Sequence, residues 1–420
     1  MRLNRWLAGI IIIFVVLSSG GQASGKSDKD LYKQLKLFAD TLDIVQKQYV
    51  EKVDAQKLIY GALKGMLASL DPHSQFMSPD LYGELKIQSQ GHFGGLGMMV
   101  TVKDNFLTVI SPLEDTPASR AGIKSGDIII KIEGKPTKDM TLMEAVKKLR
   151  GPEGTPVTIT VIRDRKLIPE ITLTRENIEL PAVKNAHIVE DGIGYIRLVE
   201  FREGTGKELE AALQKLEGEG MKGLILDLRN NPGGLLTMAV AVANKFLPKG
   251  DMIVYTRGRT PGSNRDFRAR VKPHPNYPLV LLVNGGSASA SEIVAGAIQD
   301  WNRGIIIGTK TFGKATVQTI LPLGDGSALR LTTAKYFTPK GRSIHEEKIV
   351  PDIIVKRRTV KEENVSLPHK EGEENKAEEQ NSLKTREAQD NQLQQAVSIL
   401  KAWPTFEAMF NSLKEAKSGK

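Results

Sequence analysis

Hydrophobic positions over residues 28–88 recur every three or four residues, which is the spacing of one face of an α-helix. They form a first set, Leu31, Leu35, Phe38, Leu42 and Val45, and a second set, Ile59, Leu63, Met66, Leu67 and Leu70. The pattern breaks at Asp71-Pro72, where proline favours the end of a helix. Because two amphipathic helices bury little surface by themselves, we expect this N-terminal helical segment to pack on the next domain or on another subunit.

The pattern over residues 89–175 changes to short apolar runs, which favour strands. The expected strands are Met98–Val102, Phe106–Ile110, Ile128–Ile132, Val157–Ile162 and Ile171–Thr174. Glycines gather in a loop at residues 92–97, ahead of the first strand. Thr141 and Glu144 have the spacing of a helix-capping box and predict a helix that ends near Leu149. Residues 89–175 are therefore predicted to form a small β-rich domain.

Residues 176–355 alternate predicted strands with predicted helices, which is typical of an α/β core. The predicted strands are Ile193–Leu198, Leu224–Leu228, Leu279–Val283 and Ile305–Ile307. Residues 356–392 are rich in charge and lack aromatic residues, which predicts a disordered linker. Helical spacing then resumes at Leu393, Val397 and Leu400, so residues 393–420 are predicted to contain a helix that docks on this chain or on a partner.

The N-terminus has the pattern of a secretory signal. Arg2 and Arg5 precede the apolar run Trp6–Leu17, and small residues follow it. The apolar run is shorter than the ~20 residues that span a bilayer. Residues 1–23 are therefore predicted to be a signal peptide or an uncleaved anchor. We expect the protein outside the cytoplasm, in the periplasm or cell envelope.

Composition excludes several function classes. The chain has 420 residues, enough for two or three domains, and a formal net charge of +10. No stretch interleaves basic with aromatic residues as a single-strand binder would, so no nucleic-acid partner is predicted. The absence of cysteine excludes disulfides and thiol catalysis. The histidines have no HExxH or paired metal-binding spacing, so we predict neither a metal nor a cofactor.

Two predicted strand-to-helix turns carry candidate chemistry. Gly233 and Gly234 follow one strand and let the backbone approach a substrate. Ser289 stands at the start of a predicted helix, where free N–H groups can stabilise an oxyanion. No GxSxG motif surrounds Ser289, which leaves Lys314 as the candidate base if burial lowers its pKa from ~10.4. Taken singly, Ser289 is better explained as a helix N-cap and Lys314 as a solvated surface charge.

Several segments together resemble one family, the carboxyl-terminal processing (tail-specific) serine peptidases. Residues 283–293 (VNGGSASASEI) resemble the nucleophile motif of that family, and residues 308–318 (GTKTFGKATVQ) resemble its lysine motif. Three further segments resemble its third core motif, the segment before its PDZ domain and the end of its core: 227–234, 70–74 and 341–352. The resemblance covers roughly residues 30–355.

The resemblance implies roles for matching residues. Ser289 becomes the nucleophile and Lys314 the general base of a Ser–Lys dyad. Gln318 resembles the residue that positions the lysine. The implied oxyanion donors are the backbone N–H groups of Gly233 and Ala290.

Two further roles follow from the same resemblance. Asp300 matches the charge-relay aspartate of some relatives, although a plain carboxylate at a helix end explains it as well. The backbone N–H groups of Gly95, Leu96 and Gly97 are expected to bind the C-terminal carboxylate of a substrate. This loop departs from the commonest order of the family because Met98 follows the last glycine.

The implied fold is α/β, a crotonase-like protease core with an inserted β-rich PDZ domain and N-terminal helices. The implied function is that of an exported serine endopeptidase that cleaves proteins at or near their C-termini through an acyl-enzyme. Its expected partners are polypeptides with extended C-terminal tails, with an adaptor protein and a homo-oligomer as further candidates.

Two other functions are compatible with parts of this pattern. A non-catalytic PDZ scaffold is disfavoured by the intact set of Ser289, Lys314 and Gln318. A crotonase-like acyl-CoA enzyme is disfavoured by the export signal and the PDZ module, because coenzyme A chemistry is intracellular.

Overall fold

The structure is a computed structural model and describes residues 25–358 and 385–418, except 104, 139 and 386. The predicted signal, residues 1–23, and residues 359–384 of the predicted linker lie outside the described residues. Within the described ranges, no helix is long and apolar enough to span a bilayer.

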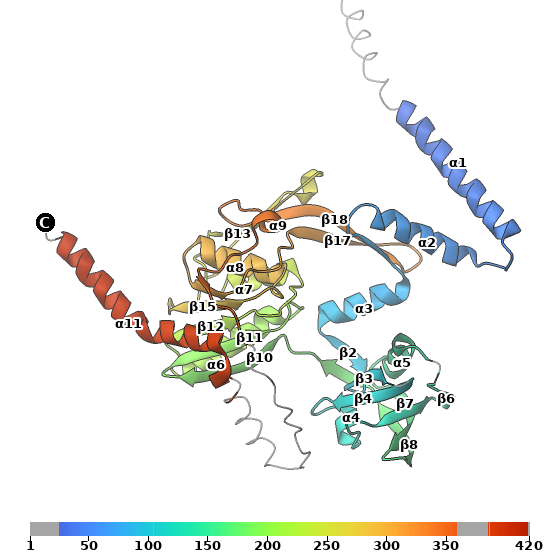
Figure 1. Cartoon of the computed structure of the whole chain (residues 1–420), viewed down its shortest axis with the longest axis horizontal. Coiled ribbons are helices and arrows are strands. Elements are labelled where there is room, and N and C mark those ends of the chain that lie inside the picture. The colour runs from blue at the N-terminus through green and yellow to red at the C-terminus, as the bar shows by residue number, and fades with distance from the viewer. Residues whose placement is uncertain (1–24, 104, 139, 359–384, 386, 419–420) are drawn as a thin grey trace, which may run out of the picture.

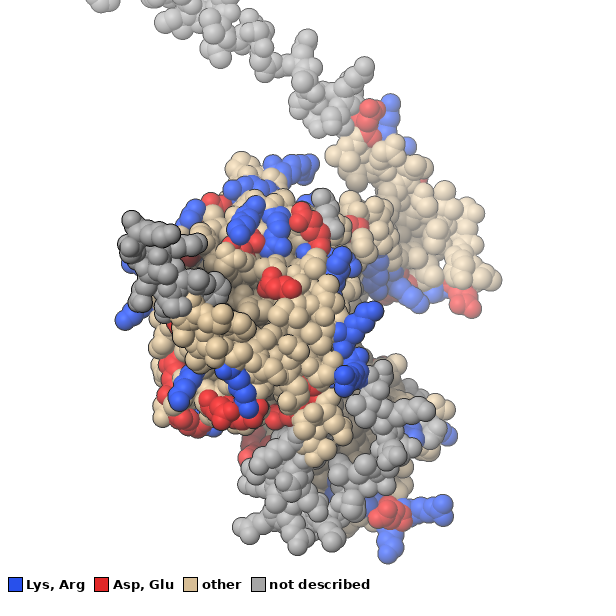
Figure 2. All heavy atoms as spheres, turned by 60° about the vertical axis from the view of Figure 1, so that its left-hand side comes forward, with Lys and Arg blue, Asp and Glu red and all other residues tan. Residues whose placement is uncertain are grey.

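Basic and acidic side chains intermingle over the face in Figure 2, so the net charge of +10 is not gathered there into one basic surface.

The N-terminal segment holds three helices and one strand: α1 (Gly25–Gln48), α2 (Ala55–Ala68), β1 (Gln75–Met77) and α3 (Pro79–Gln90). α1 extends away from the rest of the chain (Figure 1) and leaves apolar side chains such as Leu31 and Phe38 exposed. α2 begins at Asp54, whose carboxylate accepts a hydrogen bond from the Lys57 amide, as an N-cap does. Helices fill most of residues 28–88, but β1 is a strand that the helical spacing did not predict.

The β-rich domain is built on one six-stranded sheet with the order β3-β4-β5-β7-β8, and β6 pairs with β5. Its elements are β3 (Met98–Lys103), β4 (Phe106–Pro112), α4 (Pro117–Arg120), β5 (Ile128–Ile132), β6 (Lys135–Pro136), α5 (Leu142–Leu149), β7 (Pro156–Arg163) and β8 (Lys166–Thr174). Thr141 and Glu144 form the predicted capping box at the start of α5. Leu107, Ile129 and Ile159 are buried in the core between the sheet and the helices.

The chain enters and leaves this domain at one place, a two-stranded neck. The neck pairs β2 (His92–Gly95) with β9 (Glu176–Glu179) in antiparallel orientation. Just outside these strands, the Leu180 amide donates to the Gly91 carbonyl at 2.8 Å. α3 leads into the neck and lies between the β-rich domain and the rest of the chain (Figure 1). The residues at which the chain enters and leaves the domain are therefore joined by a hydrogen bond.

The α/β core is built on a six-stranded sheet with the order β10-β11-β12-β15-β16-β19. Its strands are β10 (Val183–Glu190), β11 (Ile193–Leu198), β12 (Gly223–Asp227), β15 (Leu279–Val283), β16 (Ile305–Gly308) and β19 (Ile353–Ile354). All neighbouring pairs are parallel except β10 with β11. β12 and β15 are buried along their whole length, as parallel strands are when helices cover both faces.

Helices cover both faces of this sheet. They are α6 (Thr205–Gly218), α7 (Leu236–Ala243), α8 (Ala290–Asp300) and α11 (Asn391–Ser418). The first three pack on one face through side chains such as Leu213, Val242 and Val294. α11 packs on the other face through Leu393, Ala396, Val397 and Leu400. The predicted C-terminal helix therefore docks on this chain.

A second, five-stranded sheet has the order β1-β18-β13-β14, and β17 pairs with β18. Its further elements, with two short helices, are β13 (Met252–Gly258), η1 (Pro261–Ser263), β14 (Arg265–Arg268), β17 (Thr316–Pro322), β18 (Ala328–Phe337) and α9 (Ile344–Glu347). Gln75 of β1 lies opposite Arg330, and Gln318 of β17 lies opposite Thr332. β18 thus brings the N-terminal segment close to the residues that follow Lys314.

Candidate active site

Two loops meet at the carboxyl ends of the neighbouring strands β12 and β15, where ligands bind in open parallel sheets. The loops are residues 228–235 and 284–289. The Ala288 amide and the Ser291 hydroxyl both donate to the Asn231 carbonyl oxygen, at 3.0 and 2.9 Å. These bonds hold the two loops together without any bound substrate.

Ser289 occupies a strained turn between β15 and α8. Its φ of 54° and ψ of −112° are unusual for a residue with a side chain, and such a conformation costs roughly 1–3 kcal/mol. A strained serine at a sharp strand-to-helix turn presents its hydroxyl at the top of the sheet. The sequence lacks GxSxG, yet the structure has a comparable strand–turn–helix arrangement. Ser289 also stands at the N-cap position of α8. The position is therefore compatible both with a helix N-cap and with a nucleophile.

A buried carboxylate, Glu292, joins the serine turn to the lysine loop. Its Oε2 accepts hydrogen bonds from the backbone amides of Ser289 and Lys314, each at 2.9 Å. Its Oε1 accepts from the Thr311 hydroxyl at 2.6 Å and from the Gly313 amide at 2.7 Å. One oxygen atom therefore holds both backbones and places Ser289 next to Lys314 in space.

Glu292 was not predicted to be a site residue, although the sequence contains a pattern that indicates its position. Ser289 and Glu292 have the S-x-x-E spacing of a capping box, the same pattern that was recognised at Thr141 and Glu144. Burial raises the pKa of the Glu292 carboxyl, and the hydrogen bonds that it accepts oppose that rise. All of these partners donate, so the side chain serves as an acceptor for two loops at once.

Lys314 directly precedes β17 and is partly buried. Burial is the main cause that lowers the pKa of its amine, and the Arg330 guanidinium lowers it further. A lower pKa raises the neutral fraction, which is the form that accepts a proton. Phe312, two residues before the lysine, is 55% exposed and so covers it little. Among the described residues, no hydrogen bond joins the Lys314 amine to the Ser289 hydroxyl.

The two predicted oxyanion donors lie close to Ser289: Ala290 follows it in the chain, and Gly233 approaches it from the neighbouring loop. Gly233 has a φ of +102°, and a Cβ built on it would lie 2.8 Å from the Ser289 Cβ and 2.9 Å from the Ala290 nitrogen. Only glycine allows this close approach in this conformation. The Gly233 amide donates to Asn231 Oδ1 at 2.9 Å, so it has to exchange or share that acceptor to bind an oxyanion.

Gln318 lies on strand β17 rather than on a helix. Its Nε2 donates to the Thr316 hydroxyl at 2.7 Å, and Thr332 lies opposite it on β18. In the part of the chain that the structure describes, no hydrogen bond links Gln318 to Lys314. The structure therefore places Gln318 on the strand after the lysine without a bond to it, and its positioning role stays a prediction.

The motif at residues 70–74 lies beside the lysine. The Asp71 carboxylate accepts hydrogen bonds from the His73 and Ser74 amides at 2.7 and 2.8 Å, and from the Thr332 hydroxyl at 3.3 Å. Burial is the main cause that lowers the pKa of the His73 imidazole, and the charge of the nearby lysine amine lowers it further. The neutral form of His73 is therefore favoured beside the candidate base.

Asp300 lies at the opposite end of α8 from Ser289, roughly 16 Å along the axis at 1.5 Å per residue. Its buried carboxylate accepts a hydrogen bond from the Lys340 amide at 2.8 Å and pairs with the Arg342 guanidinium. The structure thus does not bring Asp300 to the serine. Its contacts are those of a carboxylate that ties a helix end to the following loop.

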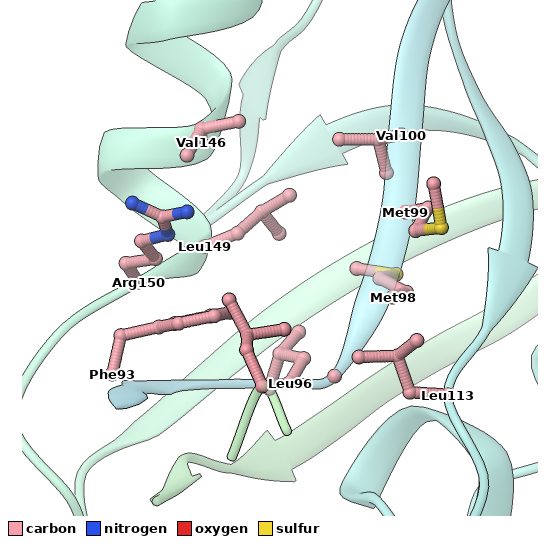
Figure 3. Close-up of a pocket in the computed structure, with 11 residues that line it drawn as sticks. Phe93, Leu96, Met98, Met99, Val100, Leu113, Val146, Leu149 and Arg150 are labelled. Carbon is pink, nitrogen blue, oxygen red and sulfur yellow. The ribbon is translucent and has the colours of Figure 1, made fainter. Parts of the chain in front are cut away.

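A separate groove lies in the β-rich domain between β3 and α5 (Figure 3). It encloses about 300 Å³ and is lined mainly by apolar side chains, among them Leu96, Met98, Val100, Val146 and Leu149. β3 is an edge strand of its sheet, so its free edge can pair with an extended peptide. At the head of the groove, Gly97 has a φ of +72°, and a Cβ there would lie 2.2 Å from the Thr116 Cβ.

Comparison with known proteins places the chain in a family. "Activating protease CtpB N-terminal domain" matches residues 16–80, "PDZ domain" matches residues 84–162, and "Peptidase family S41" matches residues 192–355. A carboxy-terminal-processing protease of Bartonella bacilliformis is 46% identical over 360 residues, which cover 84% of this chain and 82% of that protein. The chain belongs to the carboxyl-terminal processing protease family.

Other members of the family match over similar lengths. A carboxyl-terminal-processing protease of Synechocystis is 38% identical, covering 77% of this chain and 78% of that protein. The solved structure of a photosystem II D1 C-terminal processing protease is 30% identical, with a TM-score of 0.45, and covers 76% of this chain and 92% of that chain.

The two candidate sites of this carboxyl-terminal processing protease lie in different matched regions. The PDZ domain contains the groove between β3 and α5, and the S41 region contains both Ser289 and Lys314. The predicted family and the predicted α/β fold with a PDZ domain are confirmed. The chain is thus a serine-type peptidase by family.

Proposed function

We propose that this protein is an exported serine endopeptidase that cleaves polypeptides at or near their C-termini through a dyad of Ser289 and Lys314. The observation that carries the proposal is the single Glu292 oxygen that accepts from the backbone amides of both residues at 2.9 Å. It keeps nucleophile and base on adjoining loops at the carboxyl ends of parallel strands. The lowered pKa of the Lys314 amine supports its role as a base.

In the proposed reaction, Ser289 Oγ attacks the scissile carbonyl carbon and its proton passes to the neutral Lys314 amine. The oxyanion accepts hydrogen bonds from the backbone amides of Ala290 and Gly233. Lys314 returns the proton to the nitrogen of the leaving peptide, which departs and leaves an acyl-enzyme. Water, deprotonated by the same lysine, then attacks the ester carbon. The lysine returns this proton to Ser289 Oγ as that oxygen leaves, which releases the new C-terminus and restores the neutral amine.

Two rearrangements complete the site in this proposal. The Gly233 amide turns from Asn231 Oδ1 to the oxyanion. The Gln318 amide turns from the Thr316 hydroxyl to orient Lys314. Both existing bonds are single hydrogen bonds, each with a net value of roughly 1 kcal/mol, so substrate binding can offset their loss.

The PDZ domain, in this proposal, selects substrates by a free, apolar C-terminus. The groove is apolar along its length and open along the β3 edge, which suits an extended tail. Leu96 and Gly97 line this groove, and Gly95 directly precedes them at the end of β2. The backbone N–H groups of these three residues are the proposed donors. The left-handed conformation of Gly97 against Thr116 fixes the path of this loop. A carboxylate bound there accepts charge-assisted hydrogen bonds.

Amidation of a substrate's C-terminus is expected to weaken its binding at least tenfold, or ~1.4 kcal/mol, because the amide removes a charge and an acceptor. The measurement uses the full-length Ser289→Ala variant, which binds peptides without cleaving them. Two peptides with identical apolar tails, one a free acid and one an amide, are compared by calorimetry. A Val146→Asp variant serves as the control and should weaken both peptides, because Val146 lines the groove. Equal affinities for the two peptides would mean that the loop does not recognise a carboxylate.

We expect the mature protein outside the cytoplasm, either soluble or tethered by residues 6–17. The proposal rests on the arginines, the apolar run and the small residues of residues 1–23, which are ordered as in a secretory signal. Cell fractionation with an antibody against the chain tests it. A wholly cytoplasmic protein that retains Met1 and has no membrane pool would contradict it.

A further inference from the structure

The described part of the C-terminal segment returns to the sheet beside the end of β19. Asn391 Oδ1 accepts a hydrogen bond from the Arg358 amide at 3.0 Å, and Asn391 Nδ2 donates to the Lys356 carbonyl at 2.9 Å. Gln392 Nε2 donates to the Val355 carbonyl at 2.7 Å. These bonds fix where α11 begins, and its apolar face then packs on the sheet.

Arg229 is the residue at which the start of α11 meets the active-site edge of the sheet. It is only 8% exposed, and each nitrogen of its guanidinium is bound. Nε and Nη2 donate to the Asp227 carboxylate, at 3.0 and 2.7 Å for the shortest contacts. Nη1 donates to Asp390 Oδ1 and to Gln392 Oε1, each at 2.9 Å. Burial disfavours the charged guanidinium, but Asp227 and Asp390 outweigh it and raise the pKa of Arg229.

The same arginine lies near the start of the loop that carries Gly233, a proposed oxyanion donor. The Arg229 amide donates to Asp227 Oδ1 at 2.9 Å, so its guanidinium and the loop backbone share one carboxylate. Two residues further on, the Asn231 side chain accepts from the Gly233 amide, and the Asn231 carbonyl accepts from the Ser291 hydroxyl. A shift of Arg229 is therefore transmitted to Gly233 and to the turn that holds the nucleophile.

We propose that Asp390 and Gln392 are positioning residues for the oxyanion loop: they hold Arg229, and Arg229 holds the loop in place for catalysis. This inference rests on the proposed peptidase function. The catalytic unit is then incomplete without a segment that the chain supplies 161 residues after Arg229. Because an oxyanion donor acts on the transition state, loss of this hold should lower turnover rather than substrate binding.

Asp390→Asn separates the charge of this residue from its capping role. Asp390 Oδ1 also accepts from the Gln392 and Leu393 amides, each at 3.1 Å, as the N-cap of α11. Asparagine caps a helix as well as aspartate does, so the variant keeps the helix and weakens its hold on Arg229. For cleavage of a free-acid peptide by the full chain, we expect kcat to fall roughly tenfold or more, because a misplacement of 1 Å can cost 100-fold. KM should stay within about twofold of the wild-type value.

Leu400→Ala is the matched control. Leu400 lies further along the same helix and packs on the sheet, away from the capping residues. Its truncation leaves a cavity and should lower the midpoint of thermal unfolding more than Asp390→Asn does. Its kcat should stay within about twofold of the wild type. A wild-type kcat in Asp390→Asn would overturn the proposal, and so would an equal loss of kcat in Leu400→Ala.

The failure of this proposal is distinguishable from failure of the peptidase site. If Ser289→Ala cleaves the same peptide, the peptidase site is wrong. If Ser289→Ala is inactive while Asp390→Asn is fully active, only the positioning role fails. Should circular dichroism show that Asp390→Asn is unfolded, Gln392→Leu removes the other acceptor of Nη1 and carries the same expectation: a loss of kcat supports the role, and a wild-type kcat overturns it.

Discussion

Replacing Ser289 with alanine is expected to abolish peptide-bond cleavage, lowering the rate by roughly 10⁴-fold or more, while the fold stays intact. The hydroxyl is the proposed nucleophile, and neither of the other serines near it can replace it. Ser287 and Ser291 are buried, and their hydroxyls donate to the Leu228 and Asn231 carbonyls. The bond from the residue 289 amide to Glu292 belongs to the backbone and survives the substitution.

Digestion of casein or of a model peptide measures this effect, with circular dichroism as the check on folding. The matched control is Ser125→Ala, at an exposed position of the PDZ domain, which should cleave at the wild-type rate. Substantial proteolysis by a correctly folded Ser289→Ala protein would rule out the proposed nucleophile.

Lys314→Arg is expected to be nearly inactive, because a guanidinium stays protonated and cannot act as a base. In the wild type, burial lowers the pKa of the Lys314 amine, and Arg330 adds to this effect. The neutral amine is the active form of the base. Cleavage should therefore rise as the pH increases through this lowered pKa and reach a plateau above it.

The pH profile of kcat/KM measures the ionisation of the free enzyme. Lys310→Arg is the control, since Lys310 lies in the same loop but is exposed, and it should leave both rate and profile unchanged. An active Lys314→Arg enzyme, or a wild-type rate that falls as the pH rises through neutrality, would exclude a lysine base.

Much of the fold follows from patterns a few residues long. The strands Ile128–Ile132, Ile193–Leu198 and Leu279–Val283 were predicted with the bounds that the structure has, because each is a continuous apolar run between polar turns. β1 was not predicted, since it has only 3 residues and becomes a strand by pairing with β18. Its partner lies 255 residues further along the chain, beyond any local pattern.

The candidate site likewise has parts that local motifs predict and parts that only the tertiary structure determines. The motifs identify Ser289 and Lys314, but their contact through Glu292 depends on a helix start that only the capping-box spacing could have indicated. The orientation of the Gln318 amide depends on the choice between rotamers, which packing decides and sequence does not encode locally. The partners of Arg229 at the start of α11 likewise follow only from the tertiary structure.

The neck of the PDZ domain has a consequence for how such a protease diversifies. β2 pairs with β9, and the Leu180 amide donates to the Gly91 carbonyl, so the two ends of the domain lie side by side. The domain is in this sense a cassette, a unit that the chain enters and leaves at one place. A domain with adjacent ends can be inserted, exchanged or lost without redirecting the chain on either side. The parallel sheet that carries Ser289 is thereby separated from changes within the PDZ domain. New specificities can then arise by replacement of whole cassettes, while the chemistry is inherited unaltered.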